Sequence, residues 1–315
     1  MKIDIIPYAD LLAPNMGASS ELLANALRDK GIVGVKDVPQ FVEKSAHYID
    51  TVRAFAALPE AVKQRYAPQR ETGATEGYEL GAEWFKNAHG EWQIDDKKAS
   101  YYACVPDHPK NKWPEEINLR EAYLDLGVLI FDVAKKVLHA TGFLDEVKVD
   151  PNSLTGYGRM LHYQKVGDES YDNPDWCGAH LDHGTFTALM PAYYFRDGVA
   201  IDEPEEAGLF IVPTNGETFE KTYANDKSIL LFQVGEFGQL ASHDRIRATR
   251  HIVKKARGNI ERFTFALFID TPGDFTIRSS SLLNKDSRYQ DNQSVDGSIT
   301  YDAWAKASYE RYQVK

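Results

Sequence analysis

The residues best suited to chemistry are histidines and an acid in the second half of the chain. His180 and Asp182 are separated by a single residue, Leu181. On a strand, side chains at positions i and i+2 project from the same face, so an imidazole and a carboxylate would converge on one point. This pattern is typical of a metal site. Its alternative is a loop histidine that is hydrogen-bonded to a nearby acid.

His251 is the best candidate for a third ligand, because it lies in a run of alternating residues that predicts a strand. Two neutral imidazoles and one carboxylate leave three positions of an octahedral ion open, which suits Fe(II) oxygenase chemistry. A structural zinc site would be closed by four ligands. The set Cys177, His180 and His183 lacks a fourth ligand, so we favour the set that contains Asp182.

The remaining candidates for metal binding have simpler interpretations. Cys177 is expected to be a buried or half-buried thiol. His183 would face away from the metal on a continuing strand, so we expect it to line the pocket or lie at the surface. His243 falls in a polar turn, where side chains are usually solvated.

Arg262 and Thr264 share one face of a predicted strand, and the opposite face is apolar. An inward guanidinium has a high desolvation cost unless a partner meets it, and its planar fork matches a carboxylate. One interpretation is an internal ion pair with an acid such as Glu261 or Glu236. Beside the metal motif, we favour a role in anchoring an anion.

These residues must be positioned by a β-rich body that follows a helical region. Helical spacing and stop signals in the first 150 residues predict helices near 22–27, 41–58, 59–66 and 121–141, with a strand at 32–35. Residues 71–113 are predicted as long loops with short strands. Short β-branched and aromatic runs then predict strands at 158–165, 185–190, 208–212, 228–234, 247–253 and 262–269. A last helix is expected at 301–312.

This order predicts a mainly β fold with flanking helices, of the α+β class, rather than alternating βαβ units. We expect a helical N-terminal region at 1–150 that packs on the core, a catalytic core at 151–278 and a C-terminal extension at 279–315. Together they would form one functional domain.

The composition of the chain limits which binding partners and which cellular location we expect. The 315 residues carry 36 Lys and Arg against 47 Asp and Glu, a net charge of −11, which disfavours nucleic acid and anionic membranes. No apolar run is long enough to span a bilayer, the start lacks the pattern of a signal peptide, and two cysteines make no disulfide framework. We expect a cytoplasmic monomer or homodimer that binds a small molecule.

The motifs, taken in order, resemble the isopenicillin N synthase-like branch of the Fe(II)- and 2-oxoglutarate-dependent oxygenases. The resemblance spans most of the chain, and its matching segments are 26–35, 55–66, 77–78, 111–114, 180–189, 234–236, 247–253 and Arg262-x-Thr264. It implies a double-stranded β-helix, or jelly-roll, core. It also implies that the iron ligands are His180, Asp182 and His251, that Arg262 and Thr264 bind the distal carboxylate of 2-oxoglutarate, and that Tyr163 supports this co-substrate.

The implied activity is that of a dioxygenase that uses Fe(II), 2-oxoglutarate and O₂ to oxidise a small molecule and releases succinate and CO₂. An intact Asp182 favours hydroxylation, desaturation or cyclisation over halogenation, because related halogenases have a small residue there. Two alternatives stay open. One is an iron oxidase of the same fold that uses no 2-oxoglutarate, and the other is a non-catalytic ligand-binding module.

The chain departs from the family at several positions. Leu161 and Gln164 stand where the family has asparagine and proline, and Thr264 replaces a serine. The interval from His180 to His251 is long, and its extra residues near 193–206 suggest a lid or a surface loop. Four aromatic residues could line the pocket or belong to the core: Tyr78, Trp84, Phe85 and Trp92. Arg159 and Lys165 could meet an acidic substrate, but the sequence favours surface positions for both.

Overall fold

Ten strands form the main sheet of the computed structural model, which describes residues 1–86, 91–166, 175–213, 216, 218–222 and 226–313. Eight of them run in the order β1 (Ile5–Pro7), β2 (Ile32–Lys36), β14 (Ile229–Val234), β9 (Phe186–Leu189), β16 (Ile260–Asp270), β7 (Thr155–Tyr163), β6 (Lys98–Val105) and β3 (Gly77–Leu80). The hairpin of β10 (Tyr193–Arg196) and β11 (Val199–Ile201) joins through the pairing of β10 with β16.

A second, four-stranded sheet faces the inner side of the first. Its order is β13 (Glu220–Lys221), β12 (Gly208–Ile211), β15 (His251–Lys254) and β8 (Asp175–His180). Inward side chains of β8, β12 and β15 and of β7, β9 and β16 line one shared cavity. The alternation of inward and outward residues along each strand thus places a set of polar side chains between the two sheets.

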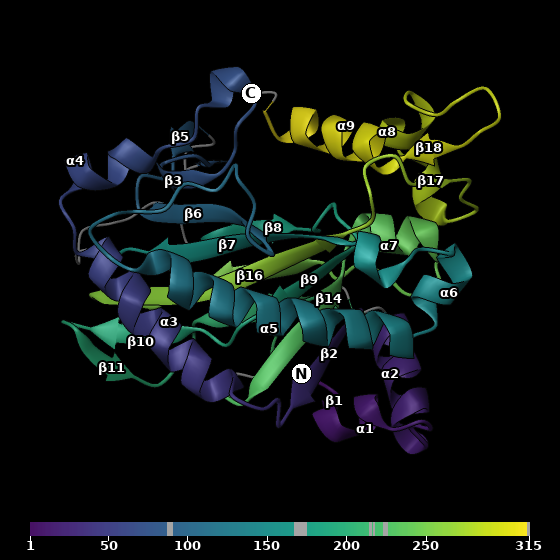
Figure 1. The fold of residues 1–315 in the computed structure, drawn as a ribbon, viewed down its shortest axis with the longest axis horizontal. Coiled ribbons are helices and arrows are strands. Elements are labelled where there is room, and N and C mark those ends of the chain that lie inside the picture. The colour runs from purple at the N-terminus through teal and green to yellow at the C-terminus, as the bar shows by residue number, and fades with distance from the viewer. Residues whose placement is uncertain (87–90, 167–174, 214–215, 217, 223–225, 314–315) are drawn as a thin grey trace.

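Two long helices, α3 (Phe41–Ala56) and α5 (Leu119–Ala140), cover the outer face of the main sheet (Figure 1). Phe265 of β16 packs edge-on against Tyr48 of α3 and Tyr123 of α5, with ring centroids 5.3 and 5.0 Å apart. Gly158 permits this close approach, because a Cβ there would lie 2.5 Å from the Tyr123 hydroxyl. The core therefore holds the strands behind the cavity in place.

Shorter elements complete the fold. The helices are α1 (Tyr8–Leu12), α2 (Ala18–Asp29), α4 (Glu60–Lys63), α6 (Phe143–Val147), α7 (Glu236–Ala241), α8 (Ser287–Gln290) and α9 (Tyr301–Gln313). Two further strand pairs are β4 (Trp84–Lys86) with β5 (Trp92–Ile94) and β17 (Thr276–Ile277) with β18 (Ile299–Thr300). A buried ion pair, Arg288 with Glu236 at 2.7 Å, joins α8 to α7, and Arg288 lies 4.2 Å from the ring centroid of Trp304. The C-terminal extension is thereby fastened to the core.

The structure confirms the main predicted elements and corrects others. The predicted helices match α2, α3, α4, α5 and α9, the predicted strand at 32–35 matches β2, and the six predicted strands of the β body match β7, β9, β12, β14, β15 and β16. The region 1–150, expected to be mostly helical, also supplies β1, β3 and β6 to the main sheet. The prediction of loops with short strands at 71–113 was wrong for the eight-residue β6. Strand β8 was not among the predicted strands, because its sequence has no β-branched residue.

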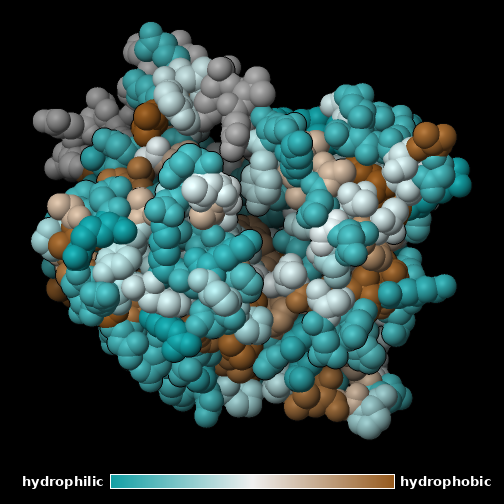
Figure 2. All heavy atoms as spheres, turned by 45° about the horizontal axis from the view of Figure 1, so that its top comes forward, coloured by the Kyte–Doolittle hydropathy of each residue, from teal (hydrophilic) through white to brown (hydrophobic). Residues whose placement is uncertain are grey.

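The face of the molecule in Figure 2 is mostly hydrophilic, with hydrophobic side chains in small scattered groups. Within the described ranges, no helix combines the length and the apolar character needed to cross a bilayer.

Candidate metal centre and adjoining cavity

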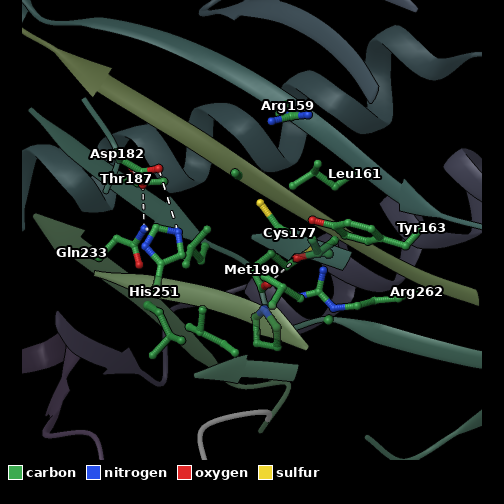
Figure 3. A pocket seen from close by; sticks show the side chains of 18 of the residues that line it. Arg159, Leu161, Tyr163, Cys177, Asp182, Thr187, Met190, Gln233, His251 and Arg262 are labelled. Carbon is green, nitrogen blue, oxygen red and sulfur yellow. Dashed lines mark hydrogen bonds and ion pairs between the residues drawn. The ribbon is translucent and has the colours of Figure 1, made fainter. Parts of the chain in front are cut away.

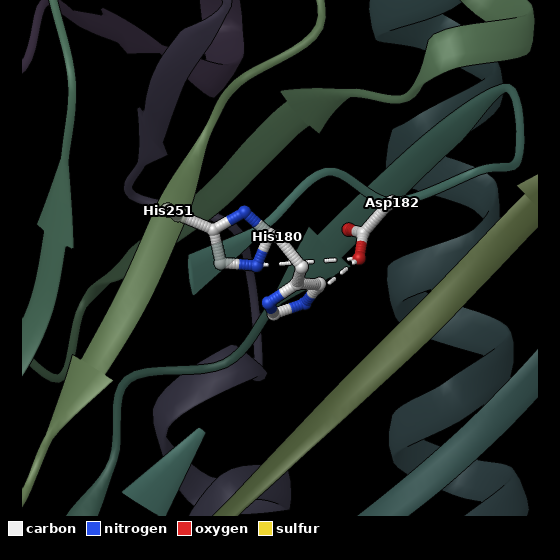
Figure 4. A group of neighbouring side chains, drawn as sticks. All are labelled: His180, Asp182 and His251. Carbon is white, nitrogen blue, oxygen red and sulfur yellow. Dashed lines mark ion pairs between the residues drawn. The ribbon is translucent and has the colours of Figure 1, made fainter. Parts of the chain in front are cut away.

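His180 and His251 lie opposite each other on neighbouring strands of the smaller sheet. His180 is the last residue of β8, His251 is the first residue of β15, and the two are partners in the antiparallel register. Their ring centroids are 4.1 Å apart. Cross-strand pairing, which the sequence could not show, therefore brings together two histidines that are far apart in the chain (Figure 4).

Asp182 reaches the two histidines from a loop and not from a strand. It lies in the connection between β8 and β9, so the prediction that His180 and Asp182 share one strand face was wrong. The loop is held by its backbone: the Asp182 carbonyl accepts a hydrogen bond from the Glu236 N–H at 2.8 Å, and the Gly184 carbonyl accepts one from Phe237 at 3.0 Å. The chain turn, rather than strand periodicity, aims the carboxylate at the imidazoles.

The three side chains form a group suited to one metal ion. Their ligand atoms all lie within 4.8 Å of one another. Asp182 Oδ1 is 3.5 Å from His180 Nε2 and 4.0 Å from His251 Nε2. Figure 4 shows the carboxylate and both rings directed toward a common point.

The hydrogen bonds of the second ring nitrogens select the tautomer that binds metal. His180 Nδ1 lies 2.8 Å from the Gly178 carbonyl oxygen, and His251 Nδ1 lies 2.9 Å from that of Thr249. A carbonyl oxygen can only accept, so each Nδ1 carries the hydrogen and donates it. In the neutral form that binds metal, each imidazole presents the lone pair of Nε2 to the centre.

Two donors hold the other oxygen of the Asp182 carboxylate. Oδ2 accepts a hydrogen bond from the Thr187 hydroxyl and one from the Gln233 side-chain amide, both at 2.6 Å. Oδ1 is left to face the histidines. Neither Thr187 nor Gln233 was predicted from the sequence to take part in the site. The available signal was that Gln233 is the one polar residue in the otherwise apolar strand β14.

Burial and charge set the protonation of this group. Burial and the neighbouring His180 lower the pKa of His251 to about 4, so this imidazole is neutral at pH 7. Burial alone would raise the pKa of Asp182. Electrostatic attraction to the imidazoles of His251 and His180, with hydrogen bonds from His180 and Thr187, outweighs it and holds that pKa well below its usual range. Asp182 is therefore an anion at neutral pH.

The other candidates for metal binding lie around this group. The backbone carbonyl of His183 accepts a hydrogen bond from Trp304 Nε1 at 2.8 Å, and its ring lies against Tyr309 of α9. His243 is exposed in a turn and accepts a hydrogen bond from the Ser280 N–H. Cys177 is a half-buried free thiol that lines the cavity, 3.8 Å from His180 Nδ1. Cys177 and His243 lie as expected, whereas the partly buried His183 is neither among the residues that line the cavity nor fully exposed.

The cavity beside the three side chains has a volume of about 110 Å³ (Figure 3). Arg262 lies in its wall, buried to 7% exposure, with Nε donating to the Tyr194 hydroxyl at 3.3 Å. Its Nη1 is buried and has no hydrogen-bond partner among the described residues. Such orphaned donors are uncommon in folded proteins and mark places where a ligand group belongs.

Thr264 and Tyr163 also line the cavity, with different environments. The Thr264 hydroxyl donates to the Met190 carbonyl at 2.7 Å, so its hydrogen is already used. The Tyr163 ring lies between two cations, with Lys98 Nζ 5.5 Å and the Arg262 guanidinium carbon 5.1 Å from its centroid. Leu161 contributes an apolar surface and no hydrogen bond at the position where the family has an amide.

The extra residues between His180 and His251, which the sequence suggested to be a lid or a surface loop, contain a strand hairpin. Residues 193–201 form this β10–β11 hairpin on β16. The Tyr194 hydroxyl donates to Glu203 at 2.9 Å, and Glu203 lines the cavity. The β10–β11 hairpin therefore positions Arg262 through the hydroxyl of Tyr194, which accepts the hydrogen bond from Arg262 Nε.

Two further expectations about the cavity need correction. Among the described residues, none of the four aromatic candidates lines it. Tyr78 is buried against Phe55, and Trp84 and Trp92 of the β4–β5 hairpin are 45% and 48% exposed. Arg159, for which the sequence favoured a surface position, points into the cavity, whereas Lys165 is exposed as expected.

Comparisons with known proteins identify the fold. No family model matches the chain, and no curated protein does. Among solved structures, the chain is similar to a protein from Caulobacter crescentus described as a 2OG-Fe(II) oxygenase family protein, with a TM-score of 0.74 and 20% identity over 99% of both chains. A full-length Neurospora crassa protein in complex with alpha-KG gives a TM-score of 0.70 and 20% identity, over 98% of this chain and 95% of that one. The rice dioxygenase for auxin oxidation gives 0.64 and 21%, over 98% and 95%.

These similarities extend over nearly the whole chain. They confirm the predicted jelly-roll core with flanking helices, and the fold agrees with the resemblance found in the sequence.

Proposed function

We propose that this protein is an Fe(II)- and 2-oxoglutarate-dependent dioxygenase that oxidises a small molecule by hydroxylation, desaturation or cyclisation and releases succinate and CO₂. One observation carries the proposal. His180, Asp182 and His251 converge, and each has its other polar atom engaged and a single ligand atom directed at the common centre. Two imidazoles and one carboxylate with open positions form the ligand set of non-haem Fe(II) oxygenases.

The spacing of these atoms fits one ion. Ligand atoms about 2.1 Å from an ion, at angles of about 90°, lie about 3 Å apart. The distances of 3.5 and 4.0 Å from Asp182 Oδ1 to the two Nε2 atoms are close to this value.

Arg262 is the residue that would hold the distal carboxylate of 2-oxoglutarate. Its unpartnered Nη1 is a buried cationic donor, and leaving such a donor unsatisfied is costly unless an anion meets it. Tyr163 lies against the guanidinium and supports the same position, and Thr264 contributes shape and a hydroxyl oxygen. When bound, Fe(II) with 2-oxoglutarate and O₂ supplies the oxidising chemistry.

The chain itself orients the reacting groups and excludes water. Thr187 and Gln233 fix the direction of the Asp182 carboxylate, and two backbone carbonyls fix the tautomers of the histidines. The apolar part of the cavity wall includes Leu161, Leu189, Leu209, Leu231, Val253 and Phe268. A dry wall of this kind strengthens the electrostatic interactions inside the site.

Binding and turnover test the proposal together. Purified protein under anaerobic conditions is titrated with Fe(II) and 2-oxoglutarate, and succinate is measured after O₂ is added. We expect the visible absorption of an iron-chelated α-keto acid, and succinate that depends on 2-oxoglutarate. Asp182→Ala should lose both signals. Succinate formation that survives in Asp182→Ala would refute the ligand assignment.

The same assay separates the competing functions. O₂ consumption without 2-oxoglutarate would identify an oxidase of the same fold, in which Arg262 holds the carboxylate of the substrate. Absence of Fe(II) binding would favour a ligand-binding module without catalysis.

We further propose that residues 1–150, 151–278 and 279–315 act as one functional domain. The strands of the first region belong to the main sheet, and α9 packs on the loop that carries Asp182. Free thiols at Cys104 and Cys177 suit a cytoplasmic location, and we expect a monomer or homodimer.

A further inference from the structure

A second cationic position lies in the cavity, apart from Arg262. Tyr163, Leu161 and Arg159 alternate along β7, and all three face the cavity. In the strand register, Tyr163 is opposite Arg262, whereas Arg159 is opposite Ala266. Four residues of a strand span about 13 Å. The two arginines therefore extend from backbone positions about 13 Å apart along the direction of β7, and Figure 3 shows Leu161 and Tyr163 between them.

Arg159 lies close to a buried lysine, Lys98, and both cations pair with one acid, Glu83. Glu83 accepts a hydrogen bond from Arg159 Nη2 and another from Lys98 Nζ, the latter at 2.5 Å. The Lys98 side chain is 3% exposed and that of Arg159 is 16% exposed. These charges are largely removed from water, so their balance matters.

Two cations, Lys98 and Arg159, share the single carboxylate of Glu83, so this ion-pair group has an excess of one positive charge. Lys98 and Arg159 hold a proton at neutral pH, and the two cations keep the pKa of the partly exposed Glu83 well below its usual range, although desolvation alone would raise it. The acid of the metal group, Asp182, faces the histidines. Glu203 is taken by Tyr194 and Lys221.

Arg159 also has a free donor in a fixed orientation. Its Nε and Nη2 donate to Ser100 at 3.0 and 2.9 Å, but Nη1 donates to no described residue. The guanidinium carbon lies 5.2 Å from the centroid of the Tyr102 ring, which itself stacks on Tyr157. The Arg159 side chain is thus held in one orientation while its Nη1 stays available to donate, as expected of a preorganised anion-binding group.

We propose that the substrate is a small organic carboxylate and that Arg159, with Lys98 beside it, binds its carboxylate group. This inference rests on the proposed function, because it assigns Arg262 to the co-substrate and Arg159 to the substrate. Glu83 is the internal counter-ion that competes with the substrate for the cation pair. Its side chain is 40% exposed, so solvent reaches it from outside the cavity.

The experiment compares acids with their neutral amides. The iron- and 2-oxoglutarate-loaded protein is titrated with two pairs of probes, phenylacetate with phenylacetamide and hexanoate with hexanamide. Binding is followed anaerobically through the visible absorption of the chelated co-substrate, and coupling through stimulated succinate release. We expect at least one acid to bind about 10-fold or more tightly than its amide.

Two variants with opposite expected effects distinguish recognition from structural support. Arg159→Gln should weaken binding of the acid about 10-fold or more and leave binding of the amide within about 3-fold. Glu83→Gln removes the competing negative charge and should strengthen binding of the acid. A merely structural cluster would lose binding in both variants. Lys165→Gln, which removes an exposed charge just beyond β7, is the matched control and should behave as wild type.

Each outcome decides one of the two proposals. If wild type shows no absorption of a chelated co-substrate, the proposed function fails. If that absorption appears but acids and amides bind equally, or no acid binds, the assignment of Arg159 fails. Weaker acid binding in Glu83→Gln would also overturn it.

Discussion

The hydrogen bond from Thr187 to Asp182 offers a sensitive test of the metal centre. Thr187→Val keeps the shape of a side chain that is 1% exposed and removes only the hydroxyl. The lost bond is 2.6 Å long and has an ionised acceptor. Hydrogen bonds to charged groups contribute about 1.5–3 kcal/mol, and partners that orient metal ligands typically change metal affinity about 10–100-fold.

Because Gln233 still holds the same oxygen, we expect the lower end of that range for the single variant. Thr187→Val should bind metal about 10-fold more weakly, and the double variant with Gln233→Leu about 100-fold more weakly. The assay is calorimetric titration of the apo protein with Mn(II), which stands in for Fe(II) and resists oxidation. Thr187→Ser keeps the hydroxyl and is the matched control, with an affinity close to that of wild type.

Thermal unfolding of each variant separates local from global effects. If Thr187→Val binds Mn(II) as tightly as wild type, with an unchanged Tm, the hydrogen bond does not orient Asp182 for metal binding. Equal losses in Thr187→Val and Thr187→Ser would also refute the reasoning, since only the first lacks the donor.

Three further predictions follow from the same geometry. Arg262→Gln should raise the KM for 2-oxoglutarate about 10–100-fold in the succinate assay, and an unchanged KM would remove Arg262 from the co-substrate site. Burial raises the pKa of Asp270 from 3.8 to about 6. The neutral carboxyl therefore contributes its whole share of the free energy of unfolding below about pH 3.8, and this share is lost as the pH rises through 6. The difference in free energy of unfolding between wild type and Asp270→Asn, measured in urea, should fall by about 2–3 kcal/mol from pH 4 to pH 7; a constant difference would contradict this. Phe265→Ala, at 0% exposure between α3 and α5, should reduce the free energy of unfolding by about 3–5 kcal/mol, and a loss below about 1 kcal/mol would argue against tight packing there.

Local patterns in the sequence were sufficient to predict most helices and strands and to select the candidate metal ligands. The apolar stripe of α5 and the alternation in β16 arise from contacts between near neighbours, so they can be read from the chain. Arg262 was found the same way, as a cation on a strand whose other face is apolar. The strand β6 was not, because its pairing with β7 and β3 overrides a stretch without clear periodicity.

The sequence by itself indicated which side chains are candidates for the chemistry: His180, Asp182 and His251 for the metal, and Arg262 for an anion. Only the tertiary structure decided how they meet. A cross-strand register joins the histidines, and a backbone-held loop delivers the acid. It also decided that Arg159 faces the cavity and that Glu83 is its partner. Strand pairing and burial depend on contacts between residues far apart in the chain, and a local sequence pattern does not specify which distant residues will meet.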